Sequence, residues 1–126
     1  MHVIRLRRPW HKSDHHGGTS ARVDVPEADV DHEHEERTFR YQRNFNLPSG
    51  LRASSQVFLR IDGWQGRLES AAVNGFPLPI EHSRIDAEIT QLLEPHNQIT
   101  LLLTGLPGQG ARLSGEVTLA IDAGSP

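Results

Sequence analysis

Residues 73–78 read VNGFPL. An Asn-Gly pair between two apolar runs is a strong signal for a β-hairpin, because the two-residue turn needs a positive φ that Asn and Gly tolerate best. The pair Asn74-Gly75 therefore predicts a tight antiparallel turn. Pro77 and Pro79 lie just beyond it. Since proline cannot donate a hydrogen bond to a sheet, we expect the returning strand to be short or at a sheet edge.

The segments around this turn alternate between apolar and polar residues. A period of two is typical of antiparallel strands that bury one face. The stretches between the segments are rich in turn formers, as in PSG, DGWQG, EPHN and GLPGQG. Seven or eight strands with this punctuation predict an antiparallel β-sandwich or a barrel. The alternating segments are RTFRYQRNFNL (37–47), QVFLRID (56–62), NQITLLLTG (97–105) and RLSGEVTLAID (112–122).

The order of the segments carries a resemblance to a known fold family. The segments concerned are YQRNFNLP (41–48), VFLRIDGW (57–64), AAVNGFPL (71–78) and IDAEITQLLEPHNQITLLLTG (85–105). This order resembles the galactose-binding-domain-like jelly roll, in particular the sugar-binding domain of family 2 glycoside hydrolases, over about residues 37–104. The resemblance implies an all-β fold, an antiparallel β-sandwich of jelly-roll type with about eight strands.

The resemblance does not imply catalysis. In the family 2 enzymes the active carboxylates lie in a separate barrel domain, and 126 residues leave no room for one. The chain also departs from the family pattern, because only PIEHSRI separates the Asn-Gly hairpin from the aspartate-Ile-Thr turn. Two further residues, Ala-Glu, lie between Asp86 and Ile89. We therefore expect a chain that is not an enzyme.

Amino-acid composition limits the classes of protein and of binding partner that fit the sequence. Hydrophobic residues make up 36% and charged residues 23% of the chain, which is typical of a soluble globular domain. The net charge of −3 gives no reason to expect binding to nucleic acid or to a membrane surface. There is no cysteine, no apolar stretch typical of a secretion signal and no run long enough to span a membrane. A cytoplasmic location is the default expectation.

Charge divides the chain into two parts of one predicted domain. Residues 24–36 hold seven acidic residues and no Lys or Arg, whereas the composition from residue 37 onward is that of a packed core. We assign residues 1–36 to N-terminal strands with polar, His- and acid-rich connections, and residues 37–126 to the sandwich core. Within the first part, we expect strands near 3–7 and 21–25 and connections over 9–20 and 26–36.

A metal site is one interpretation of the segment DVDHEHEE. In an extended strand His32 and His34 point to one side, and Asp29 and Asp31 point to the other. Imidazole with carboxylate suits a transition metal, and a row of carboxylates suits Ca²⁺. The other interpretation is a solvated polar linker, since a His-rich tract is only compositional evidence. The glycine that an EF-hand loop needs is missing.

A ligand site is predicted around Trp64, in the turn DGWQG. The indole could serve as a stacking platform for a sugar ring, or it could fold back over the edge of the sandwich and bury most of its area. Arg60, Asp62 and Tyr41 are the candidate hydrogen-bonding and stacking groups beside it.

Arg43 is unusual because it shares the apolar face of Tyr41 and Phe45. A charge on such a face must be paired or reach water, and we expect a structural role for it. One of Glu69, Glu88 or Glu116 could be its partner.

Two functions are favoured over a third, a small hydrolase or lyase that would use the His cluster and a metal. The first is a non-catalytic binding module of unknown specificity, with carbohydrate as the leading ligand class. The alternative is a structural or assembly protein that acts through protein–protein contacts, for instance as a homodimer, because unpaired sheet edges invite pairing.

Overall fold

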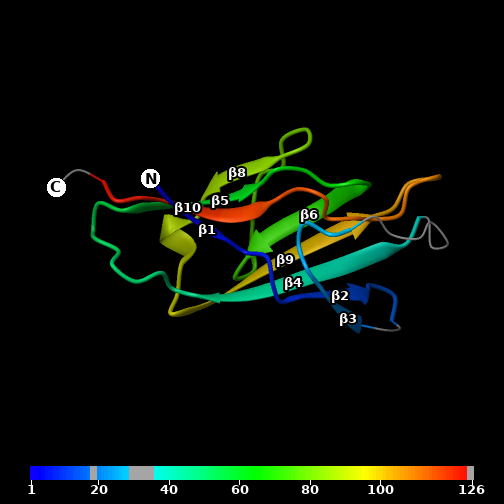
Figure 1. Cartoon of the computed structure of the whole chain (residues 1–126), viewed down its shortest axis with the longest axis horizontal. Coiled ribbons are helices and arrows are strands. Elements are labelled where there is room, and N and C mark those ends of the chain that lie inside the picture. Colours follow the sequence, from blue (N-terminus) through cyan, green and yellow to red (C-terminus); the bar gives the residue numbers. More distant parts are fainter. Residues whose placement is uncertain (18–19, 29–35, 125–126) are drawn as a thin grey trace.

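The structure is a computed structural model that describes residues 1–17, 20–28 and 36–124. Figure 1 shows two antiparallel sheets packed face to face. The smaller sheet has the order β1 (His2–Arg5), β10 (Val117–Asp122), β5 (Gln56–Ile61) and β8 (Ile85–Glu88). The larger sheet has the order β3 (Ser20–Val23), β2 (Trp10–Asp14), β4 (Thr38–Asn46), β9 (His96–Thr104), β6 (Arg67–Val73) and β7 (Phe76–Pro77). A 3-10 turn, Thr90–Leu92, precedes β9.

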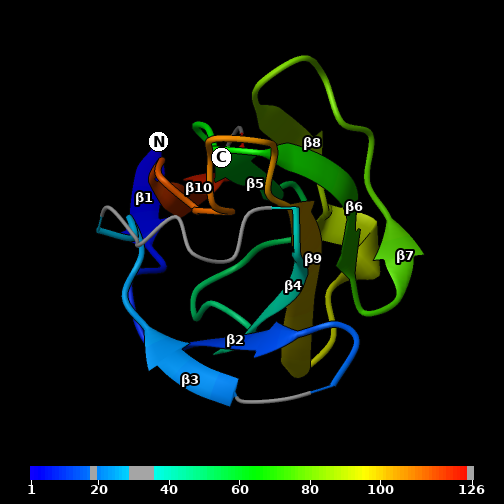
Figure 2. The ribbon, with the colours of Figure 1, turned by 90° about the vertical axis from the view of Figure 1, so that its right-hand side faces the viewer.

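The predicted antiparallel β-sandwich is confirmed, with ten strands described instead of about eight. One extra strand is β2, which falls in the expected connection over residues 9–20. It pairs with both β3 and β4, and Trp10 at its start is fully buried, with its indole N–H donating to the carbonyl of Leu6 at 2.7 Å. Figure 2 shows β2 and β3 at one end of the larger sheet and β6 and β7 at the other.

Alternation along the strands builds the core between the sheets. In β5 the odd-numbered residues Val57, Leu59 and Ile61 face inward and are fully buried. On β9 the side chains of Leu101 and Leu103 are buried in the same way. Burying one such side chain contributes about 1.5–3 kcal/mol, so this double layer is the main source of stability.

The Asn-Gly turn has the predicted geometry. Asn74 and Gly75 have φ values of 52° and 82°, as a turn between two tightly paired strands requires. Val73 pairs with Phe76, and β7 ends after Pro77 at the edge of the larger sheet. The prediction of a short edge strand is confirmed.

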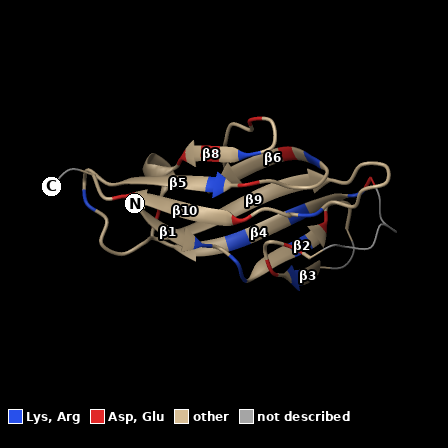
Figure 3. Cartoon of the chain, turned by 45° about the horizontal axis from the view of Figure 1, so that its top comes forward, with Lys and Arg blue, Asp and Glu red and all other residues tan. Residues whose placement is uncertain are grey.

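Charged residues of both signs are interspersed over the strands and loops in Figure 3. In the described part of the chain, no helix is long and apolar enough to cross a membrane.

Candidate functional site

Arg60 and Asp62 lie on the outer face of the smaller sheet, as the alternation of β5 requires. The Arg60 Nε atom lies 3.2 Å from Oδ1 of Asp86, its direct cross-strand neighbour on β8. The guanidinium carbon also lies 5.9 Å from the ring centre of Phe58, and Nη1 lies 3.6 Å from the sulfur of Met1. Arg60 is therefore held against the sheet by three neighbours, while Asp62 is exposed.

Trp64 lies in the loop that follows β5, and backbone hydrogen bonds tie this loop to the segment before β10. The Gln65 N–H donates to the Arg112 carbonyl at 2.7 Å, and the Gly115 N–H donates to the Gly63 carbonyl at 3.0 Å. The approach is close enough that a Cβ on Gly115 would lie 2.5 Å from the Gly63 nitrogen. Trp64 itself is half-buried and packs against the core. The loop thus holds the indole in place with part of its surface exposed.

Tyr41 does not belong with these residues. It lies on the inner face of β4, in the other sheet, and is completely buried. Its hydroxyl donates to Oε1 of Glu27 at 2.6 Å, and burial together with this carboxylate raises the pKa of Tyr41 far above its usual range. A fully buried side chain offers no surface to a ligand, so Tyr41 leaves the predicted ligand set and takes a structural role.

Glu27 is the centre of a polar cluster that the sequence did not reveal. Lys12 lies opposite Tyr41 on β2, and its ammonium group donates to Oε2 of Glu27 at 2.8 Å and to the Ala111 carbonyl at 3.0 Å. The Leu113 N–H donates to Oε1 of Glu27 at 3.0 Å. Both oxygens of a 7% exposed side chain are therefore satisfied. Glu27 lies outside any strand, in the acidic stretch expected to be a connection, so periodicity could not mark it as buried.

The predicted metal ligands His32, His34, Asp29 and Asp31 lie outside the described residues. Within the residues that are described, no group of three or more His, Cys, Asp or Glu side chains is placed to hold a metal ion. The metal site stays a prediction.

A row of amide and imidazole side chains crosses the end of the larger sheet. Asn44 and Gln98 are cross-strand neighbours, as are Asn46 and His96, and each pair is hydrogen-bonded, at 3.3 and 3.1 Å. Asn74 lies beside them and helps to line the same depression. This row was not predicted, although the outward positions of NFN and HNQ in the sequence were a usable signal.

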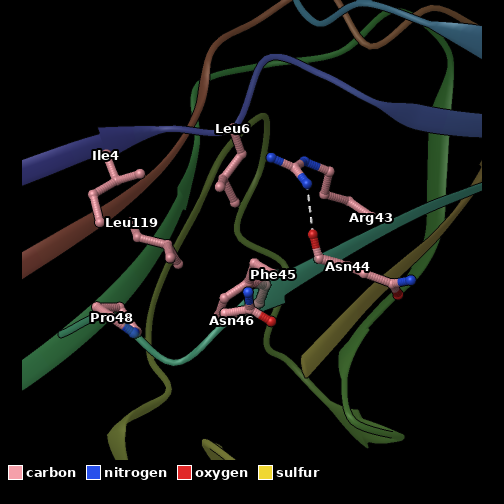
Figure 4. Close-up of a pocket in the computed structure, with 8 residues that line it drawn as sticks. All are labelled: Ile4, Leu6, Arg43, Asn44, Phe45, Asn46, Pro48 and Leu119. Carbon is pink, nitrogen blue, oxygen red and sulfur yellow. Dashed lines mark hydrogen bonds between the residues drawn. The ribbon is translucent and has the colours of Figure 1, made fainter. Parts of the chain in front are cut away.

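Arg43 points inward, as predicted, but the prediction of an acidic partner is wrong. Its Nη1 atom donates to the Asn44 carbonyl at 2.6 Å, and its Nε atom is buried without a hydrogen-bond partner in the described part of the chain. The guanidinium borders a cavity between the two sheets, shown in Figure 4. Each predicted partner is engaged elsewhere: Glu69 with Arg67 at 2.7 Å, Glu116 with Arg7 at 3.6 Å and Glu88 with Thr90 at 2.9 Å.

Comparison with known proteins gives a consistent result at the level of the fold. No family model and no curated protein matches the chain. Among solved structures, an FMN-binding β-glucuronidase from Faecalibacterium prausnitzii is 18% identical, with a TM-score of 0.76 over 94% of this chain and 22% of the other. A putative β-galactosidase from Bacteroides fragilis is 18% identical, with a TM-score of 0.75 over 95% of this chain and 23% of the other. The β-glucuronidase of Bifidobacterium dentium, complexed with coumarin-3-O-glucuronide, is 17% identical, with a TM-score of 0.73 over 96% and 30%.

The chain has the fold of one part of these glycosidases. They are family 2 glycoside hydrolases, so the predicted resemblance is confirmed for the fold. The chain spans less than a third of the length of each.

Proposed function

We propose that the chain is a non-catalytic module that binds carbohydrate through the surface formed by Arg60, Asp62 and Trp64. The observation that carries the proposal is the position of Trp64, which is half-buried in a loop that four backbone hydrogen bonds tie down and which keeps part of its indole exposed. An aromatic face fixed in this way can pack on a sugar ring without losing conformational freedom on binding. The fold shared with β-glucuronidases and a β-galactosidase supports the choice of ligand class.

The charges beside Trp64 favour binding over hydrolysis. Glycoside hydrolysis uses two carboxyl groups that flank the scissile bond, roughly 5–10 Å apart. Among the described acids near this surface, Asp86 forms ion pairs with Arg60 at 3.2 Å and Arg84 at 3.9 Å, and Glu116, beside Asp62, faces Arg7 at 3.6 Å. Asp62 forms no ion pair among the described residues, so it can accept hydrogen bonds from sugar hydroxyls.

A glycan array tests this proposal. We expect the wild-type chain to bind at least one class of glycan and Trp64→Ala to lose most of that signal. The matched control is Phe76→Ala, because Phe76 is also an exposed aromatic, with 56% of its surface accessible, but lies at the opposite end of β6. Seven residues at about 3.3 Å each place the two ends of β6 roughly 20 Å apart. Binding that survives Trp64→Ala would exclude this surface, and a blank array would count against carbohydrate as the ligand.

An assembly role is the second candidate, and it is favoured by the apolar surface at β1. Met1 and Val3 are 71% and 49% exposed, and β1 is the outermost described strand of the smaller sheet, with no described strand paired to its other edge. Such an edge can pair with a second copy of the chain. Light scattering at increasing protein concentration tests the idea, with Val3→Lys as the variant expected to weaken a homodimer. A strict monomer at high concentration would exclude it.

A further inference from the structure

The two sheets leave an opening at one edge, between β1 and the second half of β4. On β4, only Phe39–Gln42 pair with β2, so residues 43–46 have no described strand on that side. A cavity of about 460 Å³ opens between this half of β4 and the smaller sheet. This volume lies within the range of small-molecule sites in proteins.

The cavity combines apolar walls with one positive charge. Figure 4 shows Ile4 and Leu119 on the smaller sheet, Phe45 and Arg43 on β4, and Leu6 above them. Asn44 and Asn46 complete the lining together with Pro48, and none of the lining residues is acidic. The charge of Arg43 is therefore not offset by a carboxylate at the cavity wall.

One nitrogen of the Arg43 guanidinium is buried without a partner. Nη1 donates to the Asn44 carbonyl at 2.6 Å, but Nε has no hydrogen-bond partner in the described part of the chain. The Nη2 atom points toward Leu6 and the cavity in Figure 4. Partial burial also lowers the pKa of Arg43, the direction expected when a cation loses water without gaining an anion.

Lys12, a second cation that faces inward, has the acidic partner that Arg43 lacks. Lys12 also lies on the inner face of the larger sheet, and Glu27 neutralises it at a distance of 2.8 Å. The fold thus compensates one of these two cations with a carboxylate of its own. The other, Arg43, is left beside an open cavity.

We propose that this cavity binds a small organic acid, with its carboxylate on the Arg43 guanidinium and its apolar body between the sheets. The carboxylate accepts hydrogen bonds from the guanidinium on its cavity side and neutralises a charge that is delocalised over all three nitrogens. Leu6, Phe45 and Leu119 supply the apolar contacts for the rest of the molecule. A single guanidinium with apolar walls fits one carboxylate better than a multiply charged phosphate. The site is separate from the Trp64 surface, so this proposal goes beyond the carbohydrate function.

The test is a titration of the full chain with hexanoate and, in parallel, with its neutral isostere hexanamide. Binding is followed by ¹H–¹⁵N NMR, including the arginine side-chain signals, and by calorimetry. We expect hexanoate to shift the resonances of Arg43, Phe45 and Leu119, and hexanamide to bind at least about tenfold more weakly. Arg43→Gln is expected to weaken hexanoate binding by a similar factor. The control is Arg40→Gln, which removes an arginine from the same strand but from its outer face.

A second variant keeps the test decisive if Arg43→Gln perturbs folding. Ile4→Trp fills the cavity from β1 and leaves Arg43 unchanged, so it should abolish hexanoate binding while the circular dichroism spectrum stays that of the wild type. The proposal is overturned if hexanoate shifts no resonance around the cavity, if hexanamide binds equally well, or if Ile4→Trp binds hexanoate as the wild type does. None of these outcomes depends on whether Trp64→Ala loses glycan binding, so failure of this proposal can be distinguished from failure of the carbohydrate function.

Discussion

Replacing Glu27 by Gln should destabilise the chain strongly, although the two side chains have almost the same shape. The change removes the negative charge that faces the Lys12 ammonium group at 2.8 Å and turns one carboxylate oxygen into an amide N–H donor. Lys12 and Glu27 are only 12% and 7% exposed, so water cannot replace the lost partner. Removing one member of a buried ion pair costs 3–5 kcal/mol, and the remaining contact of Lys12 with the Ala111 carbonyl places this case near about 3 kcal/mol.

The measurement is urea unfolding followed by tryptophan fluorescence, because Trp10 is completely buried and lies near this cluster on β2. In a domain of this size, about 3 kcal/mol corresponds to a fall in melting temperature on the order of 10 °C. Glu81→Gln, at an exposed loop position, is the matched control and should change stability by less than about 0.5 kcal/mol.

A double-mutant cycle identifies the cause. Lys12→Met combined with Glu27→Gln leaves no uncompensated charge, so the double variant should be more stable than Glu27→Gln alone. If Glu27→Gln unfolds within about 0.5 kcal/mol of the wild type, the ion pair does not contribute to stability as the geometry implies. If the double variant is no more stable than the single one, the uncompensated charge of Lys12 is not the reason for the loss.

Two further predictions concern Tyr41 and Gly115. The pKa of Tyr41 is raised in the folded chain, so at alkaline pH the unfolded chain loses the tyrosine proton first. The stability that Tyr41 contributes is therefore fully present below the unfolded-state pKa of about 10 and falls by about 1.4 kcal/mol for each pH unit above that value. Tyr41 is the only tyrosine in the sequence, so absorbance at alkaline pH should show phenolate appearing together with unfolding. Tyr41→Phe should remove this part of the pH dependence of stability. Phenolate formation in the folded chain would contradict the burial of Tyr41. Gly115→Ala should cost about 1–3 kcal/mol and alter Trp64 fluorescence, because its Cβ would lie 2.5 Å from the Gly63 nitrogen, whereas Ser114→Ala should do neither. Wild-type stability in Gly115→Ala would mean that the loop adjusts freely.

The alternation in the sequence was enough to predict the strands that carry the core. It placed Val57, Leu59 and Ile61 on one face, and Asn74-Gly75 at a hairpin, because side-chain direction and turn geometry depend on neighbouring residues. The same alternation put Tyr41 on the apolar face. Its choice as a ligand residue went against that pattern, and the structure shows it buried.

The partners of the charged residues could not be predicted in the same way. Glu27 reaches Lys12 and Tyr41 from a segment without periodicity, and Arg43 lacks the acidic partner that its inward position led us to expect. Both outcomes depend on which residues of distant segments meet between the sheets. Hydrophobic burial is non-directional and needs only the right face, but a hydrogen bond or an ion pair needs particular atoms within about 3 Å.

The class of fold, the inward faces of the strands and the turn at VNGFPL could thus be predicted from the amino-acid sequence. The sequence did not indicate that Glu27 compensates Lys12, that Trp64 is held half-buried by the loop around Gly115, or that Arg43 borders an open cavity. The two groups of features differ in the distance along the chain between the residues involved. Strand faces and turns follow from contacts between residues close in the chain, whereas the chemistry of this protein lies where segments 15 to 99 residues apart come together.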